Sequence, residues 1–290
     1  MKDYVIRCID KKGNIRLFVA NTTNLVEEAR ITHNTSPTAT AALGRVLTGA
    51  AMLGLTMKGE KDTLTLKIKG DGPVGSIIAV ANSKGQVKGY VDNPYADLPS
   101  RADGKLDVGG LVGKNGQLAI IRDLGLKEPY IGYSNLISGE IAEDLVHYFY
   151  HSEQQPSAIN LGVLVDKDIS VRAAGGYILQ LLPGVKDEDI DRIEEIISKA
   201  EPISTLIDQG LSPEEIMDNL FGEFDMEVLE KEYIEFRCNC SRDRIEGVLI
   251  SLGKEEINKI IEEDEKAEVV CHFCNKKYNF SKEDLIKLID

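Results

Sequence analysis

Hydrophobic and polar residues alternate over several short stretches of the first 182 residues, which is the pattern of half-buried β-strands. The predicted strands are residues 3–9, 15–20, 63–69, 74–81, 86–91, 117–123, 158–165 and 177–182. Lys12-Gly13-Asn14 joins the first two and is typical of a hairpin turn. Gly-rich turns, such as Gly-Asp-Gly-Pro at 70–73, separate others.

Two stretches in the same part have helical spacing. Thr35-Ser36-Pro37 opens a predicted helix that runs to about Met57, with proline near the first turn, and a second runs from about Glu140 to His151. Small residues recur along the first helix at helical spacing, so we expect another element to pack closely against it. They are Ala41, Gly44, Thr48, Ala51 and Gly54. Residues 1–182 are therefore predicted to form a mixed α+β core domain.

Residues 183–235 are predicted to form a region of short helices. Ile190, Ile193 and Ile197 form an apolar stripe, with acidic residues before it and a lysine after it, which suits the helix dipole. Ser212-Pro213-Glu214-Glu215 is a capping box that opens a second helix. Helices of about 10 to 14 residues are marginal in water on their own. We therefore expect this segment to fold only against a neighbouring surface.

Composition and charge indicate the class of protein and the segment that holds its excess charge. Its 290 residues are 42% hydrophobic and 6% aromatic, which indicates a globular protein of two or three domains. The formal net charge of −14 lies almost entirely in residues 183–235, which hold 4 Lys and Arg against 17 Asp and Glu. That excess also fits a solvated acidic linker, although the periodic isoleucines argue against permanent disorder. No part offers the basic face that nucleic-acid binding requires.

The sequence shows no feature of export or membrane insertion. Charged residues lie within the first seven positions and no signal peptide is recognised there. No apolar run approaches the roughly 18 residues of a membrane span. We therefore expect a cytoplasmic protein, whose thiols stay reduced.

Four of the five cysteines lie in the last 53 residues, as Cys238-Asn239-Cys240 and Cys271-His272-Phe273-Cys274. Two close pairs separated by a loop supply the four ligands of a tetrahedral metal. An all-thiolate set leaves no position open for water, so the site is predicted to be structural or redox-responsive and not hydrolytic. We predict one zinc ion per chain in a small C-terminal domain, residues 236–290, with an iron–sulfur centre as the minor alternative.

The same four sulfur atoms could form two disulfides instead. Residues i and i+2 of a strand lie about 6.6 Å apart on one face, and a disulfide tolerates roughly 6.8 Å between Cα atoms. A bridge between Cys238 and Cys240 would therefore be strained and easily reduced, which suits a switch. Spacing alone does not decide between such a switch and a variant zinc knuckle.

Other candidate motifs predict no catalytic site, and we expect no enzyme activity. A phosphate loop needs four residues between its glycines and a Ser or Thr after the Lys. Gly109–Asn115 meets neither requirement, so this segment is predicted to be a turn. His147 and His151 share a helix face, but Tyr148 stands where a zinc protease needs glutamate. Cys8 lies within an alternating strand and is predicted to be a buried small side chain.

Together these parts resemble the redox-regulated thirty-three-kilodalton heat-shock protein family of bacterial holdase chaperones over nearly the whole chain. The ordered Cys-x-Cys and Cys-x-x-Cys pairs carry the resemblance most specifically. Supporting segments are residues 70–73, 139–145, 148–154 and 173–177. The family's core domain, helical linker and zinc domain match residues 1–182, 183–235 and 236–290.

The resemblance implies an ATP-independent chaperone that is inactive while reduced and zinc-bound through Cys238, Cys240, Cys271 and Cys274. Oxidation would release zinc, unfold the C-terminal region and expose apolar surface to unfolded clients, and the oxidised form would be a homodimer. We predict bridges between nearest neighbours, Cys238 with Cys240 and Cys271 with Cys274. Neither nucleic acid nor membrane is expected as a partner. An enzyme or an adaptor with a purely structural zinc ribbon is the alternative.

Overall fold

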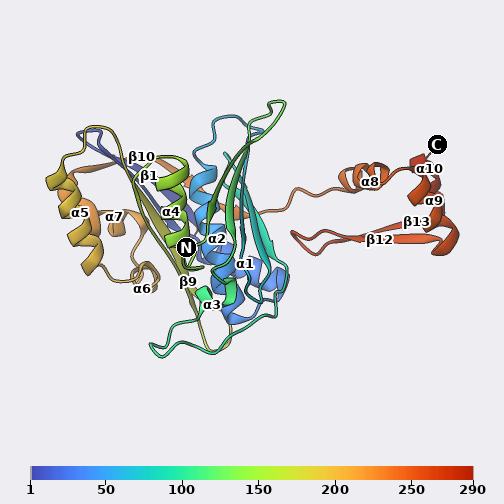
Figure 1. Ribbon diagram of the computed structural model, residues 1–290, viewed down its shortest axis with the longest axis horizontal. Helices are drawn as coiled ribbons and strands as arrows, with labels where there is room; N and C mark the ends of the chain where they lie inside the picture. Colours follow the sequence, from blue (N-terminus) through green and yellow to red (C-terminus); the bar gives the residue numbers. More distant parts are fainter. Residues whose placement is uncertain (1, 290) are drawn as a thin grey trace. The chain divides into compact units, whose positions relative to one another are not determined.

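The computed structural model describes residues 2–289 and confirms the predicted mixture of helices and strands (Figure 1). The chain forms two compact units, of which the first ends at Phe236 and the second starts at Arg237. The predicted division of the first unit into a core and a linker stays a prediction. No helix within residues 2–289 is long and apolar enough to cross a membrane.

One sheet of the first unit has five antiparallel strands in the order β10-β1-β2-β9-β8. Their bounds are Tyr4–Asp10 (β1), Ile15–Asn21 (β2), Ser157–Val165 (β8), Val171–Leu181 (β9) and Met226–Tyr233 (β10). The predicted hairpin joins β1 to β2. Its turn has Gly13 at φ 75° and is fixed by the buried Asp10 carboxylate, which accepts hydrogen bonds from the backbone N–H groups of Asn14 and Ile15.

The second sheet has six strands in the order β11-β5-β4-β3-β6-β7. Their bounds are Thr63–Lys69 (β3), Ser76–Asn82 (β4), Gln86–Val91 (β5), Gln117–Asp123 (β6), Tyr130–Asn135 (β7) and Glu235–Phe236 (β11). All neighbours are antiparallel except β11, which runs parallel to β5. The two-residue β11 ends the first unit, and Phe236 is buried there.

Four helices help to build the main core of the first unit: Thr23–His33 (α1), Pro37–Gly54 (α2), Val108–Val112 (α3) and Ala142–Ser152 (α4). The long helix α2 is almost wholly buried and packs on strands of both sheets. A Cβ atom at Gly44 would lie 2.6 Å from a methyl group of Val26, and one at Gly54 would lie 2.6 Å from Cβ of Ala81. The close packing predicted for this face is confirmed.

Helices Asp187–Lys199 (α5), Ile203–Asp208 (α6) and Pro213–Phe221 (α7) form a second apolar cluster on the five-stranded sheet. Helix α7 begins with the predicted capping box between Ser212 and Glu215. The sheet contributes Ile6, Leu17, Val19, Tyr177 and Leu179, and the helices contribute Ile193, Ile203, Leu206, Ile216 and Phe221. The short helices of this segment therefore fold against a neighbouring surface, as their length requires.

The second unit is small. It contains Arg242–Ser251 (α8), Lys254–Glu263 (α9), Lys266–Val270 (β12), Lys277–Ser281 (β13) and Lys282–Ile289 (α10), and β12 and β13 form an antiparallel hairpin. Its buried apolar residues are Leu249, Ile257, Ile261, Tyr278, Phe280 and Leu285, beside Cys271. A core of this size does not usually stabilise so short a chain without a disulfide or a metal.

Several elements differ from the sequence predictions. Helix α1 and strands β7, β10 and β11 were not predicted. Gly109–Asn115 is a turn only from Gly113 onward, because the Asp107 side chain accepts a hydrogen bond from the N–H of Gly110 and caps helix α3. Strand β9 begins at Val171, six residues before the predicted start. Its small residues leave room for α6, since a Cβ atom at Gly175 would lie 2.3 Å from Ile207.

Candidate metal centre

Two chain segments of the second unit carry the four clustered cysteines. Cys238 and Cys240 precede α8, whose first turn is capped by Ser241. Cys271 and Cys274 lie in the turn between β12 and β13. In that turn the N–H groups of Cys274 and Asn275 both approach the carbonyl oxygen of Cys271, at 3.3 and 2.8 Å. This tight turn holds the two cysteines on one side of the hairpin.

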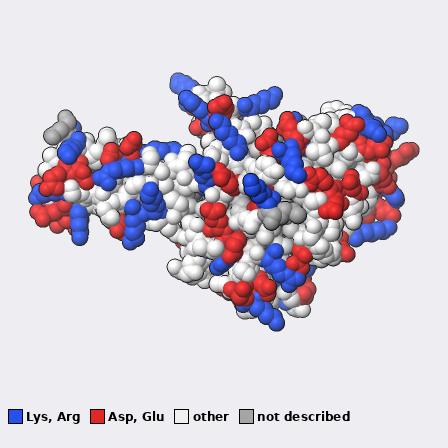
Figure 2. Space-filling model, turned by 180° about the vertical axis from the view of Figure 1, so that it is seen from behind, with Lys and Arg blue, Asp and Glu red and all other residues white. Residues whose placement is uncertain are grey.

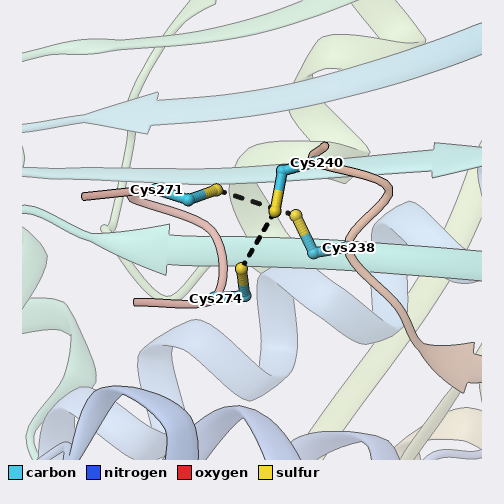
Figure 3. A group of neighbouring side chains, drawn as sticks. All are labelled: Cys238, Cys240, Cys271 and Cys274. Carbon is cyan, nitrogen blue, oxygen red and sulfur yellow. Dashed lines mark hydrogen bonds between the residues drawn. The ribbon is translucent and has the colours of Figure 1, made fainter. Parts of the chain in front are cut away.

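The four side chains turn their sulfur atoms toward one another (Figure 3). All four Sγ atoms lie within 4.8 Å of each other. The distance is 3.7 Å from Cys238 to Cys271 and 3.4 Å from Cys240 to Cys274. Ligands at about 2.3 Å from a tetrahedral zinc are separated by about 3.8 Å. The cluster can therefore hold a metal ion, and its thiolate donors and spacing are compatible with zinc.

All five cysteines are free thiols in this structure. Both of the shortest contacts join one cysteine of the Cys-x-Cys pair to one of the Cys-x-x-Cys pair. A disulfide needs about 2.05 Å between sulfur atoms, so neither contact is a bond. The predicted pairing on oxidation stays a prediction.

A tyrosine adjoins the cluster. The hydroxyl of Tyr278 donates a hydrogen bond to Sγ of Cys240 at 3.1 Å. Burial alone would raise the pKa of Cys240, but the hydrogen bonds from Tyr278 and the other three cysteines outweigh it and lower this pKa to about 7. Burial and contacts with the other thiols raise the pKa of Cys274. The site thus favours a thiolate at Cys240, the protonation state that a metal needs.

Tyr278 was not predicted as part of the site. It lies on β13, where Tyr278 and Phe280 alternate with exposed residues and point into the small core. This alternation is visible in the sequence and would have indicated that Tyr278 and Phe280 face the same side of the strand, toward a core. Its hydroxyl could not be assigned to Cys240 without the fold.

The remaining candidates lie in the first unit. Cys8 is fully buried in β1 within the cluster formed by α5 to α7, and burial, followed by the charges of Glu214 and Asp218, raises its pKa to about 12. It is a small apolar side chain, as predicted. The rings of His147 and His151 on α4 lie 4.3 Å apart. Within residues 2–289, no third His, Cys, Asp or Glu completes a metal site with them.

Comparison with known proteins extends over the whole chain. A model of the family described as "Hsp33 protein" matches residues 3–281. The "33 kDa chaperonin" of Alkaliphilus oremlandii is 52% identical over 99% of this chain and 96% of its own length. That of Acetivibrio thermocellus is also 52% identical, over 100% of this chain and 97% of its own length.

A solved structure shows the same fold. The crystal structure of the 33 kDa chaperonin (heat shock protein 33 homolog) from Thermotoga maritima superposes with a TM-score of 0.90 at 39% identity. The match covers 99% of this chain and 98% of that one. The resemblance drawn from the cysteine pattern is confirmed, and the chain belongs to the Hsp33 protein family.

Proposed function

We propose that this protein is a chaperone that binds unfolding proteins without ATP and is switched on by oxidation of its four-cysteine centre. The names of its relatives support the chaperone function. The proposed switch rests on one observation. Three short helices, and not a large fixed layer, cover the apolar face of the five-stranded sheet. A cover of this kind can be removed without destroying the main core, which is a separate cluster.

The inactive state is the reduced one, with one zinc ion held by Cys238, Cys240, Cys271 and Cys274. Zinc in small structural sites contributes about 10 to 16 kcal/mol at neutral pH, and this binding energy is folding energy. The second unit has few buried side chains of its own. We therefore infer that its fold depends on the metal.

Oxidation removes the ligands. Each bridge forms when two cysteine sulfurs give up two electrons to an oxidant such as a peroxide, which is reduced to water. Four thiolates yield two bridges and free the zinc ion. Once the metal has left, the closest sulfurs along the chain meet most readily, so we propose Cys238 with Cys240 and Cys271 with Cys274.

Loss of the second unit would weaken the elements next to it in sequence. Strand β11 has two residues, and β10, which precedes it, is exposed along most of its length. These strands connect the second unit to α7. As they detach, the helices lose support and uncover the apolar face that includes Ile6, Val19 and Tyr177. An apolar sheet face that has lost its covering helices binds unfolded polypeptide.

The charge of the protein fits this role. Acidic side chains, interspersed with basic ones, gather on the side of the surface where α5 and α7 lie, at the right of Figure 2. A high net charge keeps an opened chaperone and its clients in solution. We propose that the protein works in the cytoplasm, as a homodimer when oxidised, and that neither nucleic acid nor membrane is its partner.

The test is light scattering from a thermally aggregating enzyme, with no nucleotide present. The protein is added either reduced with zinc or after treatment with hydrogen peroxide at elevated temperature. We expect suppression by the oxidised form only, and reversal after dithiothreitol and zinc are added. Equal behaviour of the two forms would contradict the switch and favour a purely structural zinc ribbon.

A further inference from the structure

Strand β7 leaves one of its backbone edges open. It is the last strand of the six-stranded sheet and pairs only with β6. Among residues 2–289, one hydrogen bond reaches its backbone from outside the sheet and the adjoining turns, from the Ser152 hydroxyl to the Tyr133 carbonyl oxygen at 2.6 Å. That oxygen has a second lone pair and can accept another hydrogen bond. The edge therefore offers donors and acceptors to an added strand.

Several side chains around this edge are apolar and exposed, although Lys127 and Glu128 in the turn before β7 are charged. Tyr130 is 51% exposed, Ile131 41% and Tyr133 56%, and none of the six residues of β7 is charged. Leu124 and Leu126, in the turn between β6 and β7, are exposed as well. Strands β6 and β7 form the green hairpin at the upper edge of Figure 1. Ile131 and Tyr133 lie on one face of the sheet, opposite Ile121 and Ala119 of β6.

The other three sheet edges in residues 2–236 are protected against strand addition. Strand β10 carries Glu227, Glu230, Lys231 and Glu232 along its exposed length. Strand β11 has only two residues. Strand β8 is flanked by α2, α4 and α6, which pack against it. Charges, shortness and covering elements are the usual means by which proteins block edge-to-edge pairing. Strand β7 has six residues and carries no charge. Helix α4 packs against it as it does against β8, but within residues 2–289 it bonds to the backbone edge of β7 only through Ser152.

We propose that the open edge of β7 binds an extended, apolar segment of an unfolded client as an added antiparallel or parallel strand. This inference rests on the proposed chaperone function, because that function supplies unfolded polypeptide as the partner. Backbone hydrogen bonds provide affinity that does not depend on the client's sequence. Alternate side chains of the segment then pack on Ile131 and Tyr133.

The size and charge of the protein favour a client segment over a second copy of the chain. Six residues span about 20 Å. A strip of this length and one or two side chains in width is well short of the roughly 800 Å² per partner of a stable interface. Repulsion between two copies, each with a formal net charge of −14, weakens so small a contact further, so the homodimer proposed for the oxidised form uses another surface. A single extended segment needs only the strip.

A six-residue strand alone binds weakly, so the β7 edge holds clients only together with another surface. The apolar face under α5 to α7 lies on the other sheet and belongs to a different cluster. A client that contacts both surfaces is bound more tightly than by either one, because the second contact forms at a high effective concentration. The β7 edge therefore becomes useful when the helices undock.

Hydrogen exchange on the oxidised wild-type protein tests the binding. The probe is reduced, carboxymethylated α-lactalbumin, which is permanently unfolded. We expect the backbone amides of residues 130–135 to become protected when the probe is added. Unchanged exchange at 130–135, while the same protein suppresses aggregation, would overturn the inference and leave the proposed function standing.

A variant tests the contribution to activity. I131K/Y133K places two charges on the edge, and I31K/Y95K is the matched control, since Ile31 and Tyr95 are 62% and 70% exposed elsewhere on the first unit. For the oxidised β7 variant we expect the concentration that halves aggregation to rise about threefold or more, because apolar cross-strand pairs are lost. The control should suppress aggregation at the same concentration as wild type.

Zinc content and melting temperature in the reduced state verify that both variants are folded. A β7 variant as active as the control would overturn the inference, whereas an inactive wild type would refute the proposed function itself.

Discussion

Tyr278 supports the cysteine centre through one hydrogen bond, which makes it a test of how the site holds metal. Its hydroxyl donates to Sγ of Cys240 at 3.1 Å. Groups that hydrogen-bond to metal ligands typically contribute 10- to 100-fold to metal affinity. We expect Tyr278→Phe to weaken zinc binding by about tenfold, measured by competition with a chromophoric chelator. Tyr95→Phe, at an exposed position of the first unit, is the control, and equal zinc affinity of the two variants would show that the bond does not act on the metal.

The cysteines themselves set the stoichiometry. Within residues 2–289 their four sulfur atoms form the one group of three or more possible metal donors that lie close together. We expect wild type to contain one zinc per chain after purification under reducing conditions, and Cys271→Ser, Cys274→Ser to contain none, because two thiols cannot complete a tetrahedron. Elemental analysis checks both. Unchanged zinc in the double variant would place the metal elsewhere.

The approach of the four cysteines was foreseeable from spacing, because two close pairs joined by a loop have few other uses in a reduced protein. Tyr278 was not foreseeable, because its role depends on which face β13 turns toward the cysteine turn. Cys8 was foreseeable as a buried residue from strand alternation. That it lies in the cluster formed by α5 to α7 follows only from tertiary packing.

Elements with strong local signals were predicted, and those that depend on partners were not. The isoleucine stripe and the capping box gave α5 and α7, whereas α1 has no side-chain cap to mark its start. Strand β10 alternates poorly and is exposed along most of its length, so its conformation depends on pairing with β1. Strand β7 contains Gly132 and no β-branched run beyond Ile131, and its pairing with β6 determines it.

Helix α5 is the element at which docking can be tested. Ile193 is buried against the sheet cluster, whereas Ile190 and Ile197 are half-buried. Replacing Ile193 and Ile197 with serine should remove up to about 1.5 to 3 kcal/mol for each side chain that is fully buried. If the docked state is only a few kcal/mol more stable than the undocked state, this loss of burial raises the population of the undocked state. We expect the variant to suppress aggregation while reduced and with zinc bound.

Glu194→Ser is the matched control for that experiment, because Glu194 lies on the exposed side of the same helix. It should stay inactive until oxidised. Hydrogen exchange over residues 183–235 measures opening directly. An isoleucine variant that is open by exchange yet inactive would show that undocking of this segment does not control activity.

At the scale of the whole molecule, charge and apolar contact act in opposite directions on the same segment. Residues 183–235 hold 17 acidic against 4 basic side chains, so their own repulsion opposes compaction. Ion pairs such as Arg192 with Glu223 and Lys231 with Glu214 relieve some of it. These pairs are partly exposed and contribute little each. Docking of α5 to α7 therefore depends mainly on the apolar cluster. Unfolding of a neighbouring part of the chain can then shift the equilibrium toward undocked helices.

The reactivity of Cys8 measures whether α5 to α7 are docked in the intact protein. Cys8 is fully buried within the cluster that α5 to α7 complete, and its raised pKa of about 12 leaves almost no thiolate at neutral pH. We expect N-ethylmaleimide to label Cys8 slowly in the reduced, zinc-bound protein. After peroxide treatment at elevated temperature, the helices should undock, and labelling of Cys8 should accelerate in parallel with chaperone activity. Peptide mass spectrometry measures both the labelling and the disulfides in one sample.

The same sample separates the proposed mechanism from its alternatives. Bridges should join Cys238 with Cys240 and Cys271 with Cys274, while Cys8 stays a labelled thiol, and Cys8→Ser should switch as wild type does. A dominant bridge that includes Cys8 would refute the pairing. An active, oxidised protein in which Cys8 remains protected would mean that the sheet face under α5 to α7 stays covered, and clients would then have to bind a different surface.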